Sequence, residues 1–551
     1  MRILNEEYRC PLTMFCFWES NTPSKVFLNQ RSSQAWRSYT WKEAGDEIRK
    51  IVSYIDSLGL VAGSHIGILS KNSAHWVMAD LAIWLSGHVS VPLYPNLSAT
   101  TLKSIVDHSD IKVCFIGNIE RAEEQVNAIA NSIVKISLPG TSLSLEKSWE
   151  QILKEFPASN KNRVCGNDEI ASIIYTSGTT GEPKGVVHSF QAFTYAGFQG
   201  SKTLEVTSSD RFFSYLPLAH VAERLLVETF TLYSGAQIFF AGGLDTFADD
   251  LKSAQPSIFL AVPRVWTKFQ QKIQIKFSEK KLNTLLKIPL VSVIIKNKIQ
   301  SALGLNKARI LLTGAAPTSI TLLNFFSKLG MQLQEAYGMT ENYTYSHYTR
   351  PKCIKFTYVG QPFPGVETKI TEGGEVIMKS PALLKTFYKN HKLYEQVVQN
   401  GYLLSGDCGE IDSESSLKIT GRIKDTFKTE KGKYVVPSPI ELRLQKSSLI
   451  EMVCVMGVEL PQPIALITLS EMAKTLHVES LKKDLNTLRL EINAQLDPHE
   501  KLDKIIALNS SWSPESGELT PTMKIKRQVL ESRYKEQLVS WAQTNEYVLI
   551  K

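Results

Sequence analysis

The residues from Tyr175 to Gly185 combine the chemical groups that hold a phosphate. Glycines let a backbone turn tightly and approach a ligand, and hydroxyls, backbone N–H groups and the cation of Lys184 bind phosphate oxygens. A solvent-exposed loop has a similar composition. The run is not a Walker A loop, which requires Gly-Lys-Ser/Thr, because Pro183 precedes Lys184 and Gly185 follows it. The order of residues therefore predicts a phosphate-binding loop of another type.

Further stretches contain groups suited to the same ligand. His220 can donate a hydrogen bond without a permanent charge, Glu341 offers the oxygen ligands that Mg²⁺ prefers, and Arg422 has a planar fork for oxyanions. Each has an ordinary alternative, since a single His is often structural and a single Glu is often solvated. The stretches are Leu216–Arg224, Thr313–Pro317, Tyr337–Glu341, Ser405–Asp407, Gly421–Asp425 and Glu518–Arg527.

In order and spacing, these motifs resemble those of the adenylate-forming superfamily, and in particular its long-chain acyl-CoA synthetases, over residues 25–540. The resemblance implies an α/β fold. A large N-terminal domain of stacked mixed and parallel sheets with helices is expected over residues 1–422. A small mobile C-terminal α+β domain that carries the catalytic lysine is expected over residues 423–551.

The resemblance also implies the substrates and their contacts. ATP and Mg²⁺ would be used first and coenzyme A second, with Tyr337 against adenine, Asp407 on the ribose, and Thr180 and Glu341 holding the metal. The catalytic residues would be Lys524, Thr340, Glu341 and His220, with Lys526 as the fallback lysine. The implied ATP-binding residues are Thr176, Ser177, Gly178, Thr179, Thr180, Lys184, Gly314, Ala315, Ala316, Tyr337, Gly338, Thr340, Asp407, Arg422 and Lys524.

Three further roles follow from the resemblance alone. Lys424 falls at the hinge about which the small domain rotates, and Gly432 is a candidate for lining the coenzyme A channel. Family members often have Gly-Gly where this chain has Lys431-Gly432. Trp266 matches the gate of a fatty-acid tunnel, with a core aromatic as its alternative.

The expected reaction is activation of a medium- or long-chain fatty acid to an acyl-adenylate, followed by thioester formation with coenzyme A and release of AMP and pyrophosphate. An enzyme that loads a carrier protein would share every ATP motif. A luciferase-like or aryl-acid ligase fits the terminal motifs less well. A non-catalytic acyl- or nucleotide-binding scaffold on a membrane is the third alternative, although it would not need to keep Lys524.

Residues 264–309 carry eleven basic residues against one acid, Glu279, and many apolar ones. Lys268, Lys272, Lys276 and Lys280 repeat every four residues and would line one helical face. Such a segment is expected either to contact an anionic membrane peripherally or to form a solvated helical hairpin. Aromatic residues are too few for a nucleic-acid surface, so no nucleic-acid partner is expected.

Composition places the chain among ordinary globular proteins. It has 551 residues, 43% of them hydrophobic, and a net charge of +8, which suits anionic ligands. Its seven cysteines form no C-x-x-C pair, so neither a zinc site nor a disulfide framework is expected. We expect a cytoplasmic protein without signal peptide or spanning helix. The oligomeric state stays open, with a homodimer as one option.

Strands alternate with helices before and around these motifs, which favours α/β architecture with largely parallel sheets. A helix is expected to start at Thr40 and to end near Gly59. The other expected helices are 75–85 and one starting near 440, and the expected strands are 66–69, 89–93, 112–116, 170–174, 310–312, 449–457 and 464–469.

Overall fold

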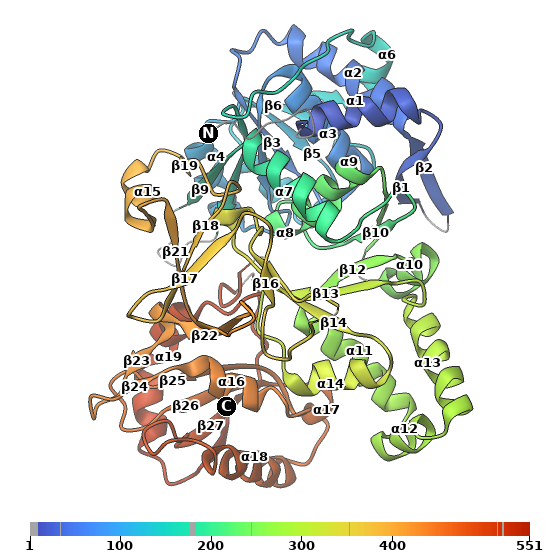
Figure 1. Ribbon diagram of the computed structural model, residues 1–551. Coiled ribbons are helices and arrows are strands. Elements are labelled where there is room, and N and C mark those ends of the chain that lie inside the picture. The colour runs from blue at the N-terminus through green and yellow to red at the C-terminus, as the bar shows by residue number, and fades with distance from the viewer. Residues whose placement is uncertain are drawn as a thin grey trace.

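The computed structural model describes residues 9–32, 35–176, 183–243, 245–351, 353–514, 516–520 and 523–551, without the side chain of Glu279. Two large sheets are formed by the chain before residue 363 together with the later strand β19, and three smaller sheets follow. Figure 1 shows the chain running from these large sheets to a separate layer formed by the last residues. The expected α/β class is confirmed.

The first large sheet has eight strands, and its centre is parallel. Its next-to-last pair at one end, β8 and β9, is antiparallel and aligns Thr176 with Lys184. The expected strands in this sheet are confirmed as β3, β4, β5 and β8. In sheet order the strands are β19 (Thr386–Phe387), β9 (Lys184–Ser189), β8 (Ile170–Thr176), β4 (Val89–Leu93), β3 (His65–Leu69), β5 (Val113–Ile116), β6 (Val134–Ser137) and β7 (Lys147–Ser148).

The second large sheet has nine strands, of which β13 and β14 run parallel and end at Gly314 and Tyr337. In sheet order its strands are β16 (Gln361–Pro362), β15 (His347–Tyr348), β14 (Leu333–Tyr337), β13 (Ile310–Gly314), β12 (Ile258–Ala261), β10 (Arg211–Ser214), β11 (Gln237–Phe240), β1 (Val26–Ser32) and β2 (Ala35–Thr40). Because parallel strands end at the same edge of a sheet, two of the expected ATP motifs come to lie side by side.

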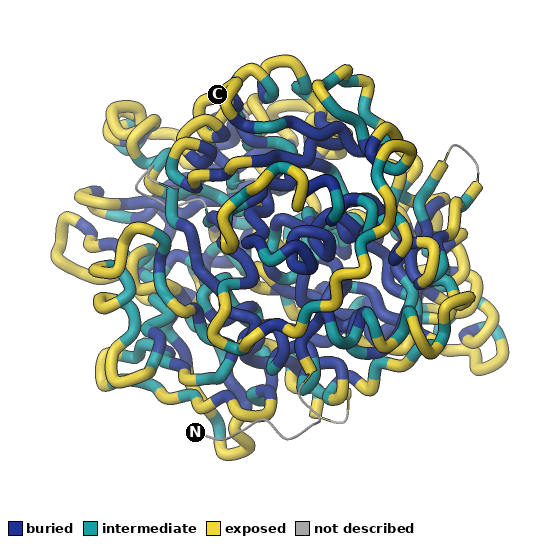
Figure 2. Tube along the Cα trace, turned by 90° about the horizontal axis from the view of Figure 1, so that it is seen from above, coloured by how far each residue is buried: buried dark blue, intermediate teal, exposed yellow. Residues whose placement is uncertain are grey.

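Helix α3 (Ala74–Ser86) contacts both large sheets and is buried along its whole length. Ser73 caps its first turn and Gly87 ends it in a left-handed conformation with φ 91°. Helix α2 (Trp41–Ser57) packs on α3. It begins after Thr40, as the sequence predicts, and Thr40 and Glu43 form a capping box at its start. Figure 2 shows the buried interior surrounded by exposed loops.

Apart from the helices of the basic segment, the remaining helices before residue 363 cover the sheets and surround the core (Figure 1). They are α1 (Pro11–Asn21), α4 (Ala99–Ser109), α5 (Ala122–Asn127), α6 (Trp149–Glu155), α7 (Phe190–Thr203), α8 (Val221–Glu223), the π-helix η1 (Arg224–Thr229), α9 (Phe230–Ser234), α10 (Phe247–Ala254), α14 (Ile320–Lys328) and the 3₁₀ turn η2 (Thr340–Asn342).

Three smaller sheets make up the rest of the described chain. The five-stranded sheet contains β17 (Glu367–Ile370), β18 (Glu375–Lys379), β20 (Val398–Gln399), β21 (Tyr402–Ile411) and β22 (Leu417–Arg422), with α15 (His391–Val397) beside it. After the 3₁₀ turn η3 (Ile423–Asp425) come the pair β23 (Phe427–Lys428) and β24 (Tyr434–Val435), and then the four-stranded sheet β25 (Ile450–Met456), β26 (Ile464–Leu469), β27 (Lys504–Leu508) and β28 (Val548–Ile550).

The four-stranded sheet buries a separate apolar cluster on each face. Helices α16 (Pro437–Leu444) and α18 (Val478–Asn493) contribute to one cluster and α19 (Arg527–Ala542) to the other, and α17 (Glu471–Lys474) follows β26. The expected helix near 440 and both strands are confirmed. A sheet that buries an apolar core on each face has the architecture of an independently folding domain.

The basic segment forms three helices, α11 (Pro263–Lys276), α12 (Glu279–Leu286) and α13 (Pro289–Leu303). The predicted single face of four lysines is wrong, because α11 ends at Lys276 and Lys280 belongs to α12. Phe277 leaves the helix with an extended backbone and packs partly into the core beside α11, which ends the helical repeat.

Candidate active site

Asp407, Tyr337 and Arg422 form one hydrogen-bonded group between the nine-stranded and the five-stranded sheets. The Tyr337 hydroxyl donates to Asp407 Oδ2 at 2.7 Å, and Arg422 Nε donates to Asp407 Oδ1 at 3.0 Å. Asp407 is buried, whereas the Arg422 side chain is 59% exposed. Two donors therefore fix the carboxylate, and the exposed side of the guanidinium is open to an anion.

Glu341 lies in the turn η2, next to this group. His188 Nε2 donates to the carbonyl of Thr340 at 2.8 Å and holds the turn in place. Burial raises the pKa of Glu341, and the cations of Lys184, Arg422 and Lys524 act in the opposite direction. One half-buried carboxylate thus lies within electrostatic reach of three cations that are far apart in the sequence.

Lys524 reaches the site from a tight hairpin in the C-terminal region. Leu519 pairs with Ile525, the Thr520 hydroxyl accepts from Lys524 N at 3.0 Å, and Met523 has φ 64°. The pKa of Lys524 is lowered to about 8, mainly by burial and also by the cation of Arg422, against the raising effects of Asp407 and Glu341. The structure therefore brings together Lys524, Arg422, Asp407 and Glu341, as the sequence predicts. Lys526 is at the N-terminal cap of α19.

His220 precedes α8, and its Nδ1 accepts from the backbone N–H of Ala222 at 3.2 Å. Burial lowers the pKa of His220 to about 3, and the cation of Lys524 acts in the same direction. The ring is therefore neutral at pH 7. Because Nδ1 is an acceptor, Nε2 carries the proton and can donate to a bound anion.

Two glycines allow close backbone approach beside these groups. A Cβ on Gly338 would meet Thr344 O at 2.6 Å, and one on Gly314 would meet Ala336 O at 2.6 Å. The following residue, Ala315, has φ 66°, a left-handed conformation that is uncommon for a side-chain-bearing residue. Gly314 therefore lets the end of β13 approach β14, and Gly338 lets the turn after β14 approach Thr344, more closely than larger residues would allow. Ala316 continues the same turn.

The run that the sequence predicts to bind phosphate is only partly described. Thr176 ends β8 and Lys184 begins β9 as its cross-strand partner. The predicted ligands Ser177, Gly178, Thr179 and Thr180 lie outside the described residues, as do Gly181 and Glu182. The position of Lys184 and its effect on Glu341 put both ends of the run at the site.

A buried ion network behind His220 was not predicted from the sequence. Arg224 donates to Glu228 Oε2 at 3.2 Å and to Ser172 Oγ at 2.7 Å, and it also pairs with Asp80. Its guanidinium lies 5.2 Å from the centre of the Phe193 ring. The sequence did contain a signal for this network. Asp80 is the only Asp, Glu, Lys or Arg in the apolar helix α3, and a buried charge requires a partner. The network anchors the π-helix η1 that follows the His220 segment.

Trp266 is fully buried in an aromatic cluster, and its Nε1 donates to Leu312 O at 3.2 Å. This environment is the one expected if Trp266 is a core aromatic residue. Its role as the gate of a fatty-acid tunnel stays a prediction. Lys424 is exposed in η3, directly after Arg422. Gly432 has φ 74°.

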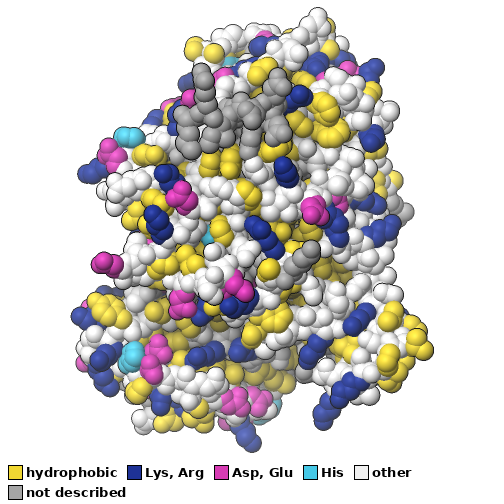
Figure 3. All heavy atoms as spheres, in the orientation of Figure 1, with side chains coloured by type: hydrophobic (Ala, Val, Ile, Leu, Met, Phe, Trp, Pro, Cys, Tyr) yellow, Lys and Arg dark blue, Asp and Glu magenta, His cyan; other side chains and the backbone are white. Residues whose placement is uncertain are grey.

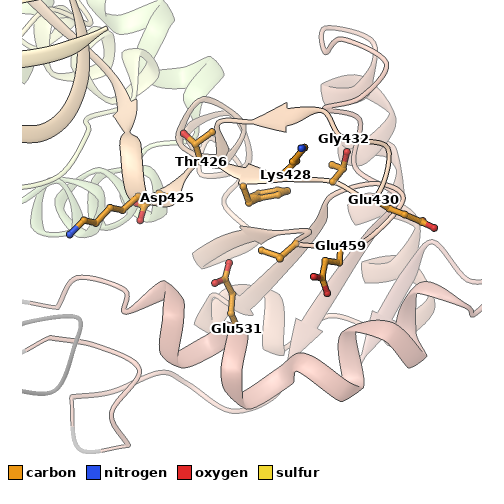
Figure 4. Close-up of a pocket in the computed structure, with 11 residues that line it drawn as sticks. Asp425, Thr426, Lys428, Glu430, Gly432, Glu459 and Glu531 are labelled. Carbon is orange, nitrogen blue, oxygen red and sulfur yellow. The ribbon is translucent and has the colours of Figure 1, made fainter. Parts of the chain in front are cut away.

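Lys424 and Gly432 line the same hollow, of about 700 Å³ (Figure 4). Its walls carry groups of both signs, including Lys428, Glu459 and Glu531. Figure 4 shows the labelled residues arranged around the hollow, from η3 and the residue after it, from the β23–β24 hairpin, from the segment after β25 and from α19. The two predicted positions therefore lie along the same hollow. Their roles as hinge and channel stay predictions.

Comparison with known proteins gives two family matches. The model of the AMP-binding enzyme family matches residues 17–388, and that of the AMP-binding enzyme C-terminal domain matches residues 424–544. Long chain acyl-CoA synthetase 2 of Arabidopsis thaliana is 28% identical, covering 93% of this chain and 89% of the relative. Long-chain-fatty-acid–CoA ligase 1 of Cavia porcellus is 29% identical, covering 93% of this chain and 83% of the relative.

Solved structures share the fold at lower identity. The anthranilate CoA ligase AuaEII in complex with anthranoyl-AMP has a TM-score of 0.80 and 19% identity, covering 97% of this chain and 98% of that one. The adenylation domain of a carboxylate reductase from Mycobacterium chelonae has a TM-score of 0.83 and 20% identity, covering 97% and 91%.

Proposed function

The chain belongs to the family of AMP-binding enzymes, and on that premise we propose that it is a fatty-acid–CoA ligase. It would activate a medium- or long-chain fatty acid with ATP to an acyl-adenylate and then transfer the acyl group to coenzyme A. The observation that carries this proposal is the convergence of Lys524, Arg422, Asp407 and Glu341. The relatives, which are named as long-chain acyl-CoA ligases, support the choice of acid.

In the first half-reaction a carboxylate must attack the α-phosphate of ATP, so two anions have to meet. Lys524 and Arg422 supply positive charge there, and neutral His220 donates a hydrogen bond without adding charge. Such fixed cations stabilise the negative charge that develops during transfer. The carboxylate of Asp407, fixed by Tyr337 and Arg422, would accept hydrogen bonds from the ribose hydroxyls.

Glu341 would hold a magnesium ion together with phosphate oxygens and Thr180. The fit is chemically sound, because Mg²⁺ takes oxygen ligands and is commonly held by one or two carboxylates plus substrate phosphates. Burial raises the pKa of this carboxyl group, so a cation that compensates for desolvation would be bound favourably. The bound ion would neutralise phosphate charge.

For the second half-reaction we propose that the region after Arg422 rotates about Lys424. This movement would withdraw Lys524 and present Gly432 to the thiol of coenzyme A. In this proposal residues 1–422 form one rigid body and residues 423–551 form the body that rotates against it. Trp266 would act near the acyl chain only if it leaves its aromatic cluster.

The test measures AMP formation from ATP with acids of increasing chain length, with and without coenzyme A. We expect an optimum at medium or long chains and a thioester product. An optimum at acetate or an aryl acid would contradict the proposed acid. A thioester formed only on a carrier protein would contradict the proposed thiol.

Lys524→Ala separates the two half-reactions. It should suppress acid-dependent pyrophosphate exchange far more than thioester formation from supplied acyl-adenylate, because Lys524 is placed for the first step only. Lys526→Ala is the matched control and should leave both activities near wild type. Equal loss of both half-reactions in Lys524→Ala would refute the division of roles.

We also propose that helices α11–α13 contact an anionic membrane surface peripherally. Leu290 is 81% exposed, Ile275 84% and Ile294 64%. Exposed lysines surround them, and in Figure 3 apolar and basic side chains lie together on the lobe at the lower right. The exposed lysines are Lys268, Lys272, Lys276, Lys280, Lys281, Lys287 and Lys298. Within the described part of the chain, no helix is both long and apolar enough to cross a bilayer.

Each lysine near an anionic leaflet contributes about 1 kcal/mol of binding free energy. Replacing Lys280, Lys281 and Lys287 together by Glu should therefore abolish sedimentation with phosphatidylglycerol-containing vesicles. A matched triple of exposed lysines elsewhere, Lys25, Lys42 and Lys154 to Glu, has the same change in net charge and should retain binding. Equal loss in both triples would show that net charge acts without this surface.

A further inference from the structure

Two cysteines that are 155 positions apart in the sequence meet in the N-terminal core. The backbone N–H of Cys165 donates to Cys10 Sγ at 3.4 Å, and the two thiols also interact directly. Each residue is 6% exposed, and both are free thiols. Cys10 precedes α1, and Cys165 lies in the segment that leads into β8, the strand before the phosphate-binding run.

The surroundings of Cys10 stabilise a thiolate. Cys10 is the N-cap residue of α1, an eleven-residue helix whose N-terminal dipole favours negative charge. The Thr13 hydroxyl lies 3.2 Å from its sulfur. The hydrogen bond with Cys165 is the largest influence and lowers the pKa of Cys10 to about 5, against the opposing effect of burial.

The surroundings of Cys165 suit the second thiol of a pair. Arg163 Nη1 donates to Cys165 Sγ at 3.4 Å and is itself tied to Glu169 by an ion pair. The interaction with Cys10 raises the pKa of Cys165, so this thiol keeps its proton. Among the residues that the structure describes, Cys16 and Tyr233 are further titratable groups that interact with Cys10. Burial raises the pKa of both.

We propose that Cys10 and Cys165 form a reversible disulfide when the protein meets a peroxide. The Cys10 thiolate attacks one peroxide oxygen, the O–O bond breaks, and a sulfenic acid and hydroxide result. The Cys165 thiol then attacks the sulfenic sulfur, an S–S bond forms, and water leaves with the thiol proton. Two thiols are oxidised by two electrons and one hydrogen peroxide is reduced to two waters.

The bond would join the start of α1 to the segment entering β8. A cross-link between residues so far apart restricts the unfolded chain more than the folded one. Oxidation should therefore raise the melting temperature, and a dithiol reductant should return it to the starting value. This inference is independent of the fatty-acid–CoA ligase proposal.

The test treats the whole protein with hydrogen peroxide and maps its peptides without reduction. We expect the peptides containing Cys10 and Cys165 to be linked, two titratable thiols to be lost, and dithiothreitol to restore both. Because the attacking thiol is already ionised, the rate should change little between pH 8 and pH 6. An ordinary thiol would slow on the order of 100-fold over this range.

Variants identify the partners. Cys165→Ser should stop at a sulfenic acid on Cys10, which dimedone traps, whereas Cys16→Ser should cross-link as wild type does. The exposed thiol of Cys353 is the internal comparison, because exposure alone would make it react first. A Cys10–Cys16 link, first reaction at Cys353, or no link in the wild-type map would each overturn the proposal.

Discussion

Among the residues of the candidate site, Lys524 has the surroundings that bear most directly on the proposed adenylation step. It lies half-buried beside one cation and two carboxylates, and desolvation is the main cause that lowers its pKa to about 8. Its charge therefore depends on pH in the range where enzymes are assayed. Lys184, at the start of β9, faces the same carboxylate of Glu341, so the two lysines have separate positions around one site.

The first half-reaction should lose rate as pH rises through about 8. The active form of Lys524 is the cation, and a lowered pKa means that this cation is present below 8 and is lost above it. The kcat/KM for pyrophosphate exchange, which reports the free enzyme, measures this ionisation.

Lys524→Arg provides the control, because guanidinium stays charged throughout this range. Its activity should be lower but should show no decline between pH 7.5 and 9. Lys526→Ala should keep the wild-type profile. If the decline persists unchanged in Lys524→Arg, another group is responsible for it.

At the level of elements, the turns after β13 and β14 set the spacing of the site. Both strands end at one edge of the nine-stranded sheet, and Gly314 and Gly338 let the two turns approach backbone atoms closely. The turn after β14 leads directly into η2 with Glu341, and its start holds Tyr337 against Asp407. A shift of this turn would move several groups of the site at once.

Gly338→Ala should destabilise the protein by about 1–3 kcal/mol, the usual cost of overpacking. The added Cβ would lie 2.6 Å from Thr344 O and 2.7 Å from Thr344 C, which are backbone atoms that cannot rotate away. Thermal unfolding measures the loss, and ATP binding should weaken with it.

Gly373→Ala is the matched control, because the nearest atom to its Cβ would be Thr371 Oγ1 at 3.8 Å. It should leave both the melting temperature and ATP affinity near wild type. A Gly338→Ala protein with unchanged melting temperature would show that the turn has room to relax.

On the scale of the molecule, an ion pair joins the N-terminal and C-terminal regions. Arg264, in the first turn of α11, pairs with Glu451 of β25, and both side chains are partly buried. In the same arrangement Lys524 lies beside Arg422, Asp407 and Glu341. The pair therefore stabilises the arrangement that we assign to the first half-reaction.

Arg264→Ala or Glu451→Gln should lower pyrophosphate exchange relative to thioester formation from supplied acyl-adenylate. A partly exposed ion pair is worth at most about 1 kcal/mol, so the ratio should change by up to about 5-fold. The exchanged pair Arg264→Glu with Glu451→Arg should recover part of the wild-type ratio. An unchanged ratio in both single variants would contradict this role.

The sequence by itself determined the elements and the family resemblance. Helix α2 with its Thr40 cap, the strands before the ATP motifs, and the motifs that carry Asp407, Arg422 and Lys524 could all be predicted, because periodicity, caps and motif spacing are local properties of a chain. The lysine repeat at 268–280 misled for the same reason, since local spacing does not reveal that Phe277 packs into the core.

Tertiary structure decided which distant groups meet. The Tyr337–Asp407 hydrogen bond, the Arg224–Asp80 network, the Arg264–Glu451 pair and the contact of Cys10 with Cys165 all join residues from separate elements. Their charges and pKa shifts come from burial and from neighbours across sheets, which local patterns in a single sequence do not encode. The identity of the chemical groups was thus readable in the chain, whereas their ionisation and pairing follow from the packing.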